Sequence, residues 1–212
     1  MNKSQLTNFI TKYTLGGEIK STKWTSDGNS LSTRFISGDK SVVGKVELNK
    51  FSHLKPCELG VYNTGQLTSL LSVLGDDVEV NLSQSGDKFI SMELEDTKRK
   101  TKSKYMLSDL SVIPTPPELK NLPDSFELGI KVDPYFVSTF ISGKGALSEA
   151  ETFTILTENG ETKIVIGYAS IASNRVTIPV ETTKGGEIEP ISFNANMFAS
   201  ILNANKDCES AT

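Results

Sequence analysis

Few residues in this 212-residue chain have the type and spacing that chemistry requires. His53 is the only histidine, and no carboxylate or cysteine accompanies it at the spacing of a general base or a metal ligand. Gly143-Lys144 resembles the end of a phosphate-binding loop, but that loop needs glycine at 138 and serine or threonine at 145, where the chain has Ser138 and Gly145. Zinc-binding, EF-hand and dinucleotide-binding patterns are absent from the sequence. We therefore expect a protein that is not an enzyme and uses no metal or cofactor.

The other reactive or charged groups favour structural roles. Cys57 and Cys208 are isolated thiols without CxxC spacing, so reduced cysteines in a cytosol are expected, with a disulfide left open. The densest basic run, Lys98–Lys104, is typical of a solvated loop that protects a sheet edge, and contact with DNA or a partner is the alternative. No segment approaches the roughly 20 apolar residues of a membrane span, and Met1–Thr14 has no continuous apolar region. We expect a soluble, cytoplasmic protein without membrane contact.

The net charge of −4 is unevenly divided. Residues 1–112 carry 15 Lys and Arg against 13 Asp and Glu, and residues 113–212 carry 7 against 13. Neither half is basic enough to bind nucleic acid tightly through phosphate attraction.

An internal repeat with an offset of 131 residues occurs in two separate places. Leu6–Thr11 aligns with Val137–Ser142, matching phenylalanine with phenylalanine and isoleucine with isoleucine. Glu58–Asp76 aligns with Glu189–Asp207 at the same offset and matches an asparagine, a serine and a leucine. Chance matches between unrelated helices have no reason to share a spacing, so a duplicated domain is favoured.

Four amphipathic helices are predicted, two in each copy, because apolar residues recur at the spacing of one helix face. Asp133 before Pro134 is typical of a helix N-cap and first turn, and Asn194 is a second predicted cap. The predicted helices cover residues 4–14, 64–75, 134–147 and 195–206.

Between the helices, apolar and polar residues alternate, and turn pairs such as Asp27-Gly28 and Asn159-Gly160 indicate hairpins. The predicted strands are Val42–Leu48, Glu58–Tyr62, Val78–Ser83, Lys88–Leu94, Lys102–Leu107, Glu127–Val132, Thr152–Leu156, Lys163–Ala169 and Arg175–Val180. This pattern predicts an α+β fold in which antiparallel sheets dominate and helices pack on one face.

A proline-dense segment, residues 113–123, lies between the two copies. Such a composition is typical of an extended connector. We therefore expect a first domain over residues 1–112, this linker, and a second domain over residues 124–212.

The four predicted helices share polar faces without acidic residues. Their 49 residues contain no Asp or Glu, although the chain average of 26 acidic residues in 212 would place about 6 there. Lys3, Lys12, Lys144 and Lys206 supply positive charge within or beside them. Sparse lysines among neutral Ser, Thr and Asn would attract phosphates without reading bases, so we predict that these four lysines face DNA. The alternative is that the faces lie against another protein layer.

With this repeat, these helices and this linker, the sequence resembles the sliding clamps of T-even-type bacteriophages, the DNA polymerase processivity factors. The specific likeness is in Glu58–Val80, where a strand ending in Tyr62 leads into an apolar-striped helix and the pair Asp76-Asp77. The resemblance implies a duplicated sliding-clamp fold in which helices line a ring and sheets form its outside.

The resemblance also implies partners and sites. A homotrimeric ring would encircle duplex DNA, a clamp loader ATPase would open and close it, and the DNA polymerase would dock its C-terminal peptide in an apolar pocket beside the linker. Segment 104–107 would pair edge to edge with segment 175–180 of a neighbouring subunit. The matching pocket positions are Met106, Leu107, Val112, Ile113 and Leu119.

The second copy departs from this pattern at its end. At the offset of 131, Thr212 corresponds to Asn81, so about 30 residues that follow Asn81 in the first copy have no counterpart. The second domain is therefore expected to lack its last strands, either because the chain is truncated or because its second sheet closes differently. The rival functions are an oligomeric viral tail or capsid component and, less favoured, a small hydrolase with an unrecognised site.

Overall fold

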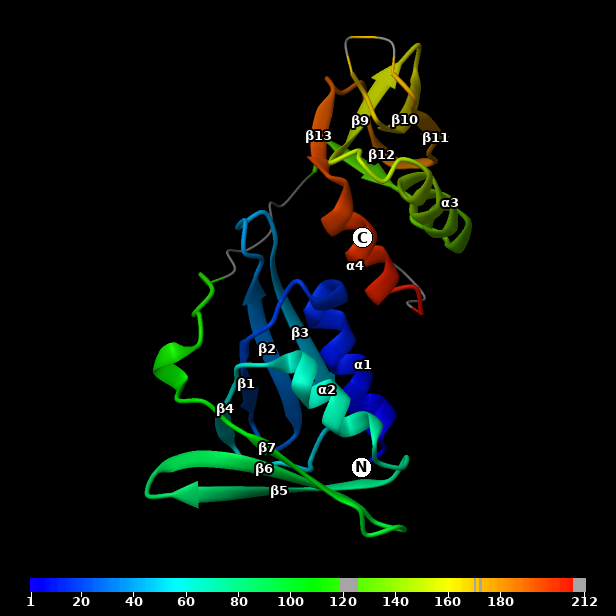
Figure 1. Ribbon diagram of the computed structural model, residues 1–212. Helices are drawn as coiled ribbons and strands as arrows, with labels where there is room; N and C mark the ends of the chain where they lie inside the picture. The colour runs from blue at the N-terminus through cyan, green and yellow to red at the C-terminus, as the bar shows by residue number, and fades with distance from the viewer. Residues whose placement is uncertain (119–125, 170, 172, 208–212) are drawn as a thin grey trace. The chain divides into compact units, whose positions relative to one another are not determined.

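The computed structural model describes residues 1–118, 126–169, 171 and 173–207, and the chain divides into two compact units, Met1–Leu119 and Lys120–Thr212 (Figure 1). The division falls within the proline-dense segment 113–123.

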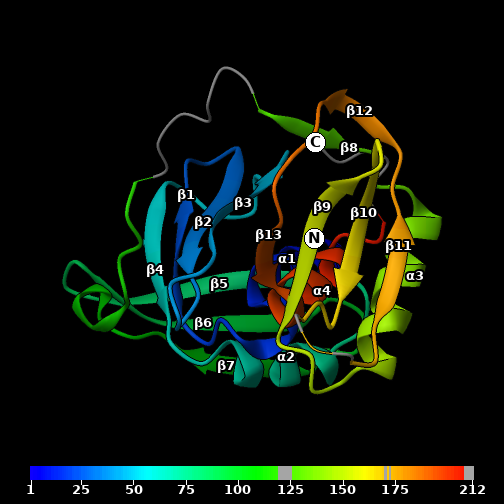
Figure 2. The ribbon, with the colours of Figure 1, turned by 90° about the horizontal axis from the view of Figure 1, so that it is seen from above.

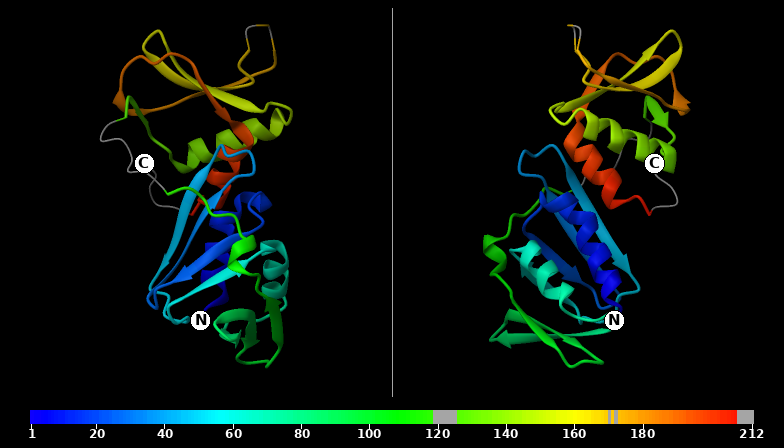
Figure 3. Two further views of the ribbon diagram at one scale, coloured as in Figure 1. Left: turned by 90° about the vertical axis from the view of Figure 1, so that its left-hand side faces the viewer. Right: turned by 45° about the vertical axis from the view of Figure 1, so that its right-hand side comes forward.

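The first unit places two helices against two antiparallel sheets. One sheet has the strand order β3-β2-β1-β4 and the other β5-β6-β7. Figure 3 shows α1 in blue and α2 in cyan side by side. The elements are α1 (Lys3–Thr14), a 3₁₀ turn (Leu15–Gly17), β1 (Thr22–Ser26), β2 (Ser30–Ile36), β3 (Val43–Asn49), β4 (Cys57–Val61), α2 (Thr64–Ser72), β5 (Val78–Ser85), β6 (Lys88–Asp96), β7 (Lys102–Met106) and a second 3₁₀ turn (Leu110–Val112).

A buried aromatic cluster joins both helices to the first sheet. Alternation along β1 turns Trp24 toward the helices, where its side chain is fully buried. The indole N–H of Trp24 donates to the Tyr13 hydroxyl at 3.2 Å, which lies 3.3 Å from the Thr64 hydroxyl. Phe9 packs edge-on against Trp24 with ring centroids 5.5 Å apart. Burial raises the pKa of Tyr13 far above its usual range, so the hydroxyl stays neutral inside the core.

Asp96 fastens the second sheet to the end of α2. Its carboxylate accepts hydrogen bonds from the backbone N–H groups of Gly75, Lys98 and Arg99. These bonds, that of Arg99 first, lower the pKa of Asp96 below its usual value. A side chain at position 75 would collide with the Asp96 carboxylate, so this close approach requires glycine.

The second unit repeats the plan with α3 and α4 against the sheet β11-β10-β9-β13 (Figure 2). A separate two-stranded sheet pairs β8 with β12. The elements are β8 (Leu128–Ile130), α3 (Pro134–Ala146), β9 (Thr152–Glu158), β10 (Glu161–Ile166), β11 (Val176–Pro179), β12 (Thr182–Gly185), β13 (Ile191–Asn194) and α4 (Ala195–Ala204).

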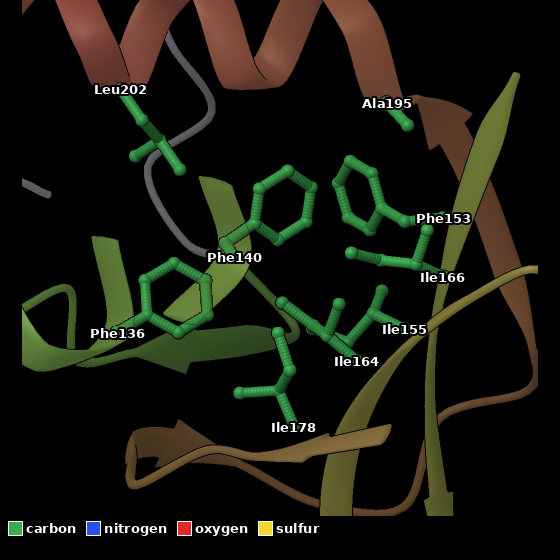
Figure 4. Packing of buried hydrophobic residues seen from close by; sticks show 9 residues of the cluster. All are labelled: Phe136, Phe140, Phe153, Ile155, Ile164, Ile166, Ile178, Ala195 and Leu202. Carbon is green, nitrogen blue, oxygen red and sulfur yellow. The ribbon is translucent and has the colours of Figure 1, made fainter. Parts of the chain in front are cut away.

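The core of the second unit is apolar and rich in phenylalanine (Figure 4). Phe140 of α3 is fully buried, and its ring lies edge-on to Phe153 of β9 with centroids 5.1 Å apart. Phe198 of α4 packs within 4.9 Å of both rings. Ile164 and Ile166 of β10 close the cluster from the sheet.

The predicted α+β fold and the repeat are confirmed by caps and strand register. The side chains of Asn2, Asn63, Asp133 and Asn194 each accept a backbone N–H from the first turn of their helix, at positions related in pairs by 131 residues. The hairpin β1–β2 pairs Trp24 with Thr33, and the equivalent hairpin β9–β10 of the second unit pairs Ile155 with Ile164. The offset therefore holds in the sheets as well as in the helices.

Several boundaries differ from the prediction. Strands β1, β2, β12 and β13 were absent from the predicted set. Strands β1 and β12 consist largely of Thr, Lys and Ser, which hides their alternation. Helix α2 ends at Ser72 and α4 at Ala204, earlier than predicted. The segments before the first helix of each unit also pair differently. Asn2, before α1, forms an isolated bridge to Asp77, which precedes β5, whereas β8, before α3, pairs with β12. Among the described residues, α4 is the last element, and β5–β7 have no second copy.

The core of the first unit yields a stability prediction. Tyr13→Phe leaves the buried Trp24 N–H without its acceptor, so the free energy of unfolding should fall by about 1–3 kcal/mol in chemical denaturation. Tyr62→Phe is the matched control, because the Tyr62 side chain is 56% exposed. Equal stability of the two variants would contradict the assigned role of the hydroxyl.

Candidate functional site

The solvent-facing sides of the helices are neutral and polar. On α1, exposed positions include Gln5, Asn8 and Thr11, and on α2 they include Thr68 and Ser69. None of the four helices contains an acidic residue. The predicted acid-free helices are therefore present, and their polar faces are rich in hydroxyl and amide groups.

Many of these hydroxyl groups donate to their own helix. Thr11 donates to the Thr7 carbonyl at 2.9 Å, and Thr68 donates to the Thr64 carbonyl at 3.0 Å. Ser138 of α3 donates to a carbonyl in the same way at 2.9 Å. A phosphate needs donors, so hydroxyl groups already bound to carbonyls offer it little attraction. Any contact of these faces with a phosphate backbone is then weak.

Two of the four predicted lysines have their ammonium groups at helix C-termini. Lys3 donates to the Leu74 carbonyl at 2.5 Å and so links the start of α1 to the end of α2. Lys144 is buried, and it donates to the carbonyls of Leu147 at 3.4 Å and Ser148 at 2.7 Å. Cations are favoured at helix C-termini, where carbonyls lack partners in the helix.

The other two lysines are placed differently. Lys12 lies in the last turn of α1 and is half-buried. Lys206 follows α4 and is exposed.

The segment that leaves β7 forms a strap, defined here as residues 107–118. Ser108 donates its N–H to the Gly60 carbonyl at 2.9 Å, and a side chain at position 60 would collide with the Ser108 backbone. Lys88 pairs with Asp109 at 2.5 Å, and this hydrogen bond holds the pKa of the Asp109 carboxyl below its usual range. Ile113 is buried near Gly60. These contacts fix the start of the strap to β4 and β6.

Two hollows flank the strap on the face of the first sheet that points away from Trp24. The first, of about 310 Å³, is lined by Glu18, Ile19, Lys20, Ser21, Arg34, Phe35, Ile36, Gly38, Pro114 and Pro116. The second, of about 270 Å³, is lined by Lys23, Thr25, Ser32, Thr33, Arg34, Lys45, Glu58, Pro114, Thr115 and Pro116. Arg34, Pro114 and Pro116 border both.

The four described residues of the predicted pocket do not line these hollows. Met106 and Val112 are exposed, Leu107 is half-buried, and Ile113 within the strap is buried. Leu119 lies outside the described residues. Alternation along β2, which turns Arg34 and Ile36 outward, is the sequence signal that would have found the lining residues.

The residues considered for chemistry are separate from these surfaces. Partial burial lowers the pKa of His53, whose ring packs against Phe51 at 5.3 Å, and burial raises the pKa of the Cys57 thiol. Cys208 lies outside the described residues. Among the residues that the structure describes, no group of three His, Cys, Asp or Glu could hold a metal ion, and no helix could cross a membrane.

The basic run at the β6–β7 turn is largely paired with acids of the same sheet. Lys98 contacts Asp77 at 2.9 Å, and Lys102 contacts Glu95 at 2.9 Å. The Lys102 hydrogen bond lowers the pKa of Glu95. These pairs support the reading of a solvated sheet edge.

Paired helices backed by antiparallel sheets, repeated in two units, define the sliding-clamp fold. The chain is similar to the crystal structure of PCNA, a sliding clamp, from Thermococcus kodakaraensis, with a TM-score of 0.65 over 96% of this chain and 83% of that chain. The two sequences are 12% identical. No protein-family model and no curated protein matches the sequence.

The placement of Lys144 gives a second prediction. Lys144→Met keeps the length of the side chain but removes the ammonium from two carbonyls, so the unit should lose about 1 kcal/mol of stability. Thermal unfolding compares it with Lys206→Met, an exposed lysine. If both variants melt like the wild type, the capping role of Lys144 is wrong.

Proposed function

We propose that this chain is a subunit of a sliding clamp that encircles duplex DNA and tethers a DNA polymerase for processive synthesis. The observation that carries the proposal is the set of four acid-free helices within a clamp-type fold. A DNA-lining surface must tolerate phosphates along its whole length without binding them tightly, and neutral hydroxyl and amide groups meet that requirement. The protein acts as a scaffold and not as an enzyme.

The DNA-facing cations in this proposal are Lys12 and Lys206. Lys3 and Lys144 place their ammonium groups at helix ends. Lys12 and Lys206 are chosen for their positions in the last turn of α1 and directly after α4. Electrostatic attraction to DNA is then low, and topological linkage must replace affinity in keeping the protein on DNA.

The ring would form by edge-to-edge strand pairing between copies. Strand β7 has β6 on one side only, and β11 has β10 on one side only among the described strands. Such edges can accept a strand from another chain. Pairing of β7 from one copy with β11 of the next gives a head-to-tail contact, which closes into a ring. The trimer and the kinship with T-even-type phage clamps rest on the resemblance of Glu58–Val80.

Partner proteins would bind beside the strap. A polymerase peptide would place its apolar side chains against the strap and the first hollow, where Ile36, Pro114 and Pro116 provide apolar surface. Met106, Leu107, Val112, Ile113 and Leu119 remain the proposed flank of this site. A clamp loader ATPase would open the ring.

The proposal predicts a closed three-subunit ring and retention on circular DNA. Native mass spectrometry and particle imaging should show the ring, and the cognate loader should leave the protein on nicked circular DNA until the DNA is linearised. A monomer or a filament would count against the clamp, and a filament would favour an oligomeric viral structural protein instead.

The helical face has its own test in the same assay. Lys12→Glu with Lys206→Glu should shorten retention and the polymerase run length by about tenfold, because two attractive charges become repulsive. Lys55→Glu with Lys184→Glu makes the same charge change at exposed positions outside the helices. If the two double variants behave alike, the assigned DNA face is wrong.

A further inference from the structure

Three basic residues stand directly opposite one another across the outer face of the first sheet. The strand register pairs Lys23 of β1 with Arg34 of β2, and Arg34 with Lys45 of β3. Like charges directly opposite one another destabilise a sheet. A row of three basic residues on adjacent strands is therefore unfavourable for the sheet. Such locally unfavourable arrangements are expected at functional sites.

The two outer members of this cationic row have acidic partners, and the central one does not. Lys23 lies 3.6 Å from Glu58, and Lys45 lies 2.6 Å from Glu47. Among the described residues, the guanidinium of Arg34 forms neither an ion pair nor a side-chain hydrogen bond. Its five N–H donors are thus available in a half-buried position, where an ionic partner is screened less than at a fully exposed site.

The strap makes this row a recess and not an open face. Arg34 borders both hollows, and Pro114 and Pro116 of the strap line each of them as well. The first hollow adds Lys20 and the apolar side chain of Ile36. A ligand lying along the strap would therefore meet an apolar surface on one side of Arg34 and the cationic row on the other.

We infer that Arg34, flanked by Lys23 and Lys45, binds the carboxylate of an acidic residue in a partner peptide that lies along the strap. The inference rests on the proposed function, since it names the chemistry of the partner at the same site. A guanidinium fork receives a carboxylate through two parallel hydrogen bonds, which fixes the peptide's register as well as adding affinity. The apolar residues of the peptide would then occupy the first hollow.

A peptide is favoured over nucleic acid because acidic residues are interspersed with the cations. Glu58 lines the second hollow, Glu18 lines the first, and Glu47 stands beside Lys45. A continuous phosphate backbone would meet these carboxylates, whereas a single peptide carboxylate can reach Arg34 between them. The site thus selects one negative charge at one position.

The test uses two synthetic decapeptides that share the same two leucines and one phenylalanine and differ only in carrying two aspartates or two asparagines. Fluorescence anisotropy with the full-length protein should show the aspartate peptide binding about tenfold more tightly at low salt, with the difference shrinking as salt rises. Arg34→Gln should abolish the difference, and Arg34→Lys should retain part of it. Arg99→Gln, at an exposed arginine on the β6–β7 turn, should leave it unchanged.

Three outcomes would overturn the inference: equal binding of the two peptides to the wild type, no binding of either, or an undiminished preference in Arg34→Gln. Loss of binding to a short duplex DNA in Arg34→Gln would reassign the row to nucleic acid and overturn it as well. Folding is checked by melting, where Arg34→Gln should be at least as stable as the wild type because it relieves the like charges. Ring formation by Arg34→Gln, measured by native mass spectrometry, should match the wild type, so failure of the proposed ring would appear separately.

Discussion

The alternation of side chains along β1 is the constraint on which both candidate surfaces depend. Trp24 turns inward to Tyr13 and Phe9, and it thereby fixes α1 and α2 on one side of the first sheet. The residues on either side of it, Lys23 and Thr25, must then point outward to the strap. A register shift of one residue would exchange the two sets and destroy both surfaces at once. The helical face and the strap hollows therefore both depend on the inward packing of Trp24.

The two copies fill the same position of the fold with different chemistry. At an offset of 131, Tyr13, Trp24 and Thr64 of the first unit correspond to Lys144, Ile155 and Ala195 of the second. The first set shares hydrogen bonds inside the core, whereas Ile155 and Ala195 are apolar and Lys144 sends its ammonium to the end of α3. Each solution satisfies its polar groups, as a buried position requires. Their difference explains why the duplication is visible in spacing more than in identity.

The features that could be predicted from the sequence are those that local chemistry determines. The four helices, the caps Asp133 and Asn194 and the 131-residue repeat follow from spacing and residue type, and the fold class follows from them together with the strand alternation. The outward row on β1 to β3 could not be predicted, because register between strands depends on partners that periodicity does not identify. The burial of Lys144 was missed for a different reason. The sequence of a helix does not indicate whether the ammonium of one of its lysines reaches water or a backbone carbonyl.

Hydroxyl groups that bond to the carbonyls of their own helix also affect motion. The hydroxyl groups of Thr11 and Thr68 already donate to backbone carbonyls. They would therefore form no strong hydrogen bond to DNA phosphates that has to break each time the duplex moves along the surface. If DNA passes along this surface as proposed, the free-energy profile for its translation should therefore be shallow. A ring lined in this way, as the proposed function requires, would meet little friction from the protein's own contacts.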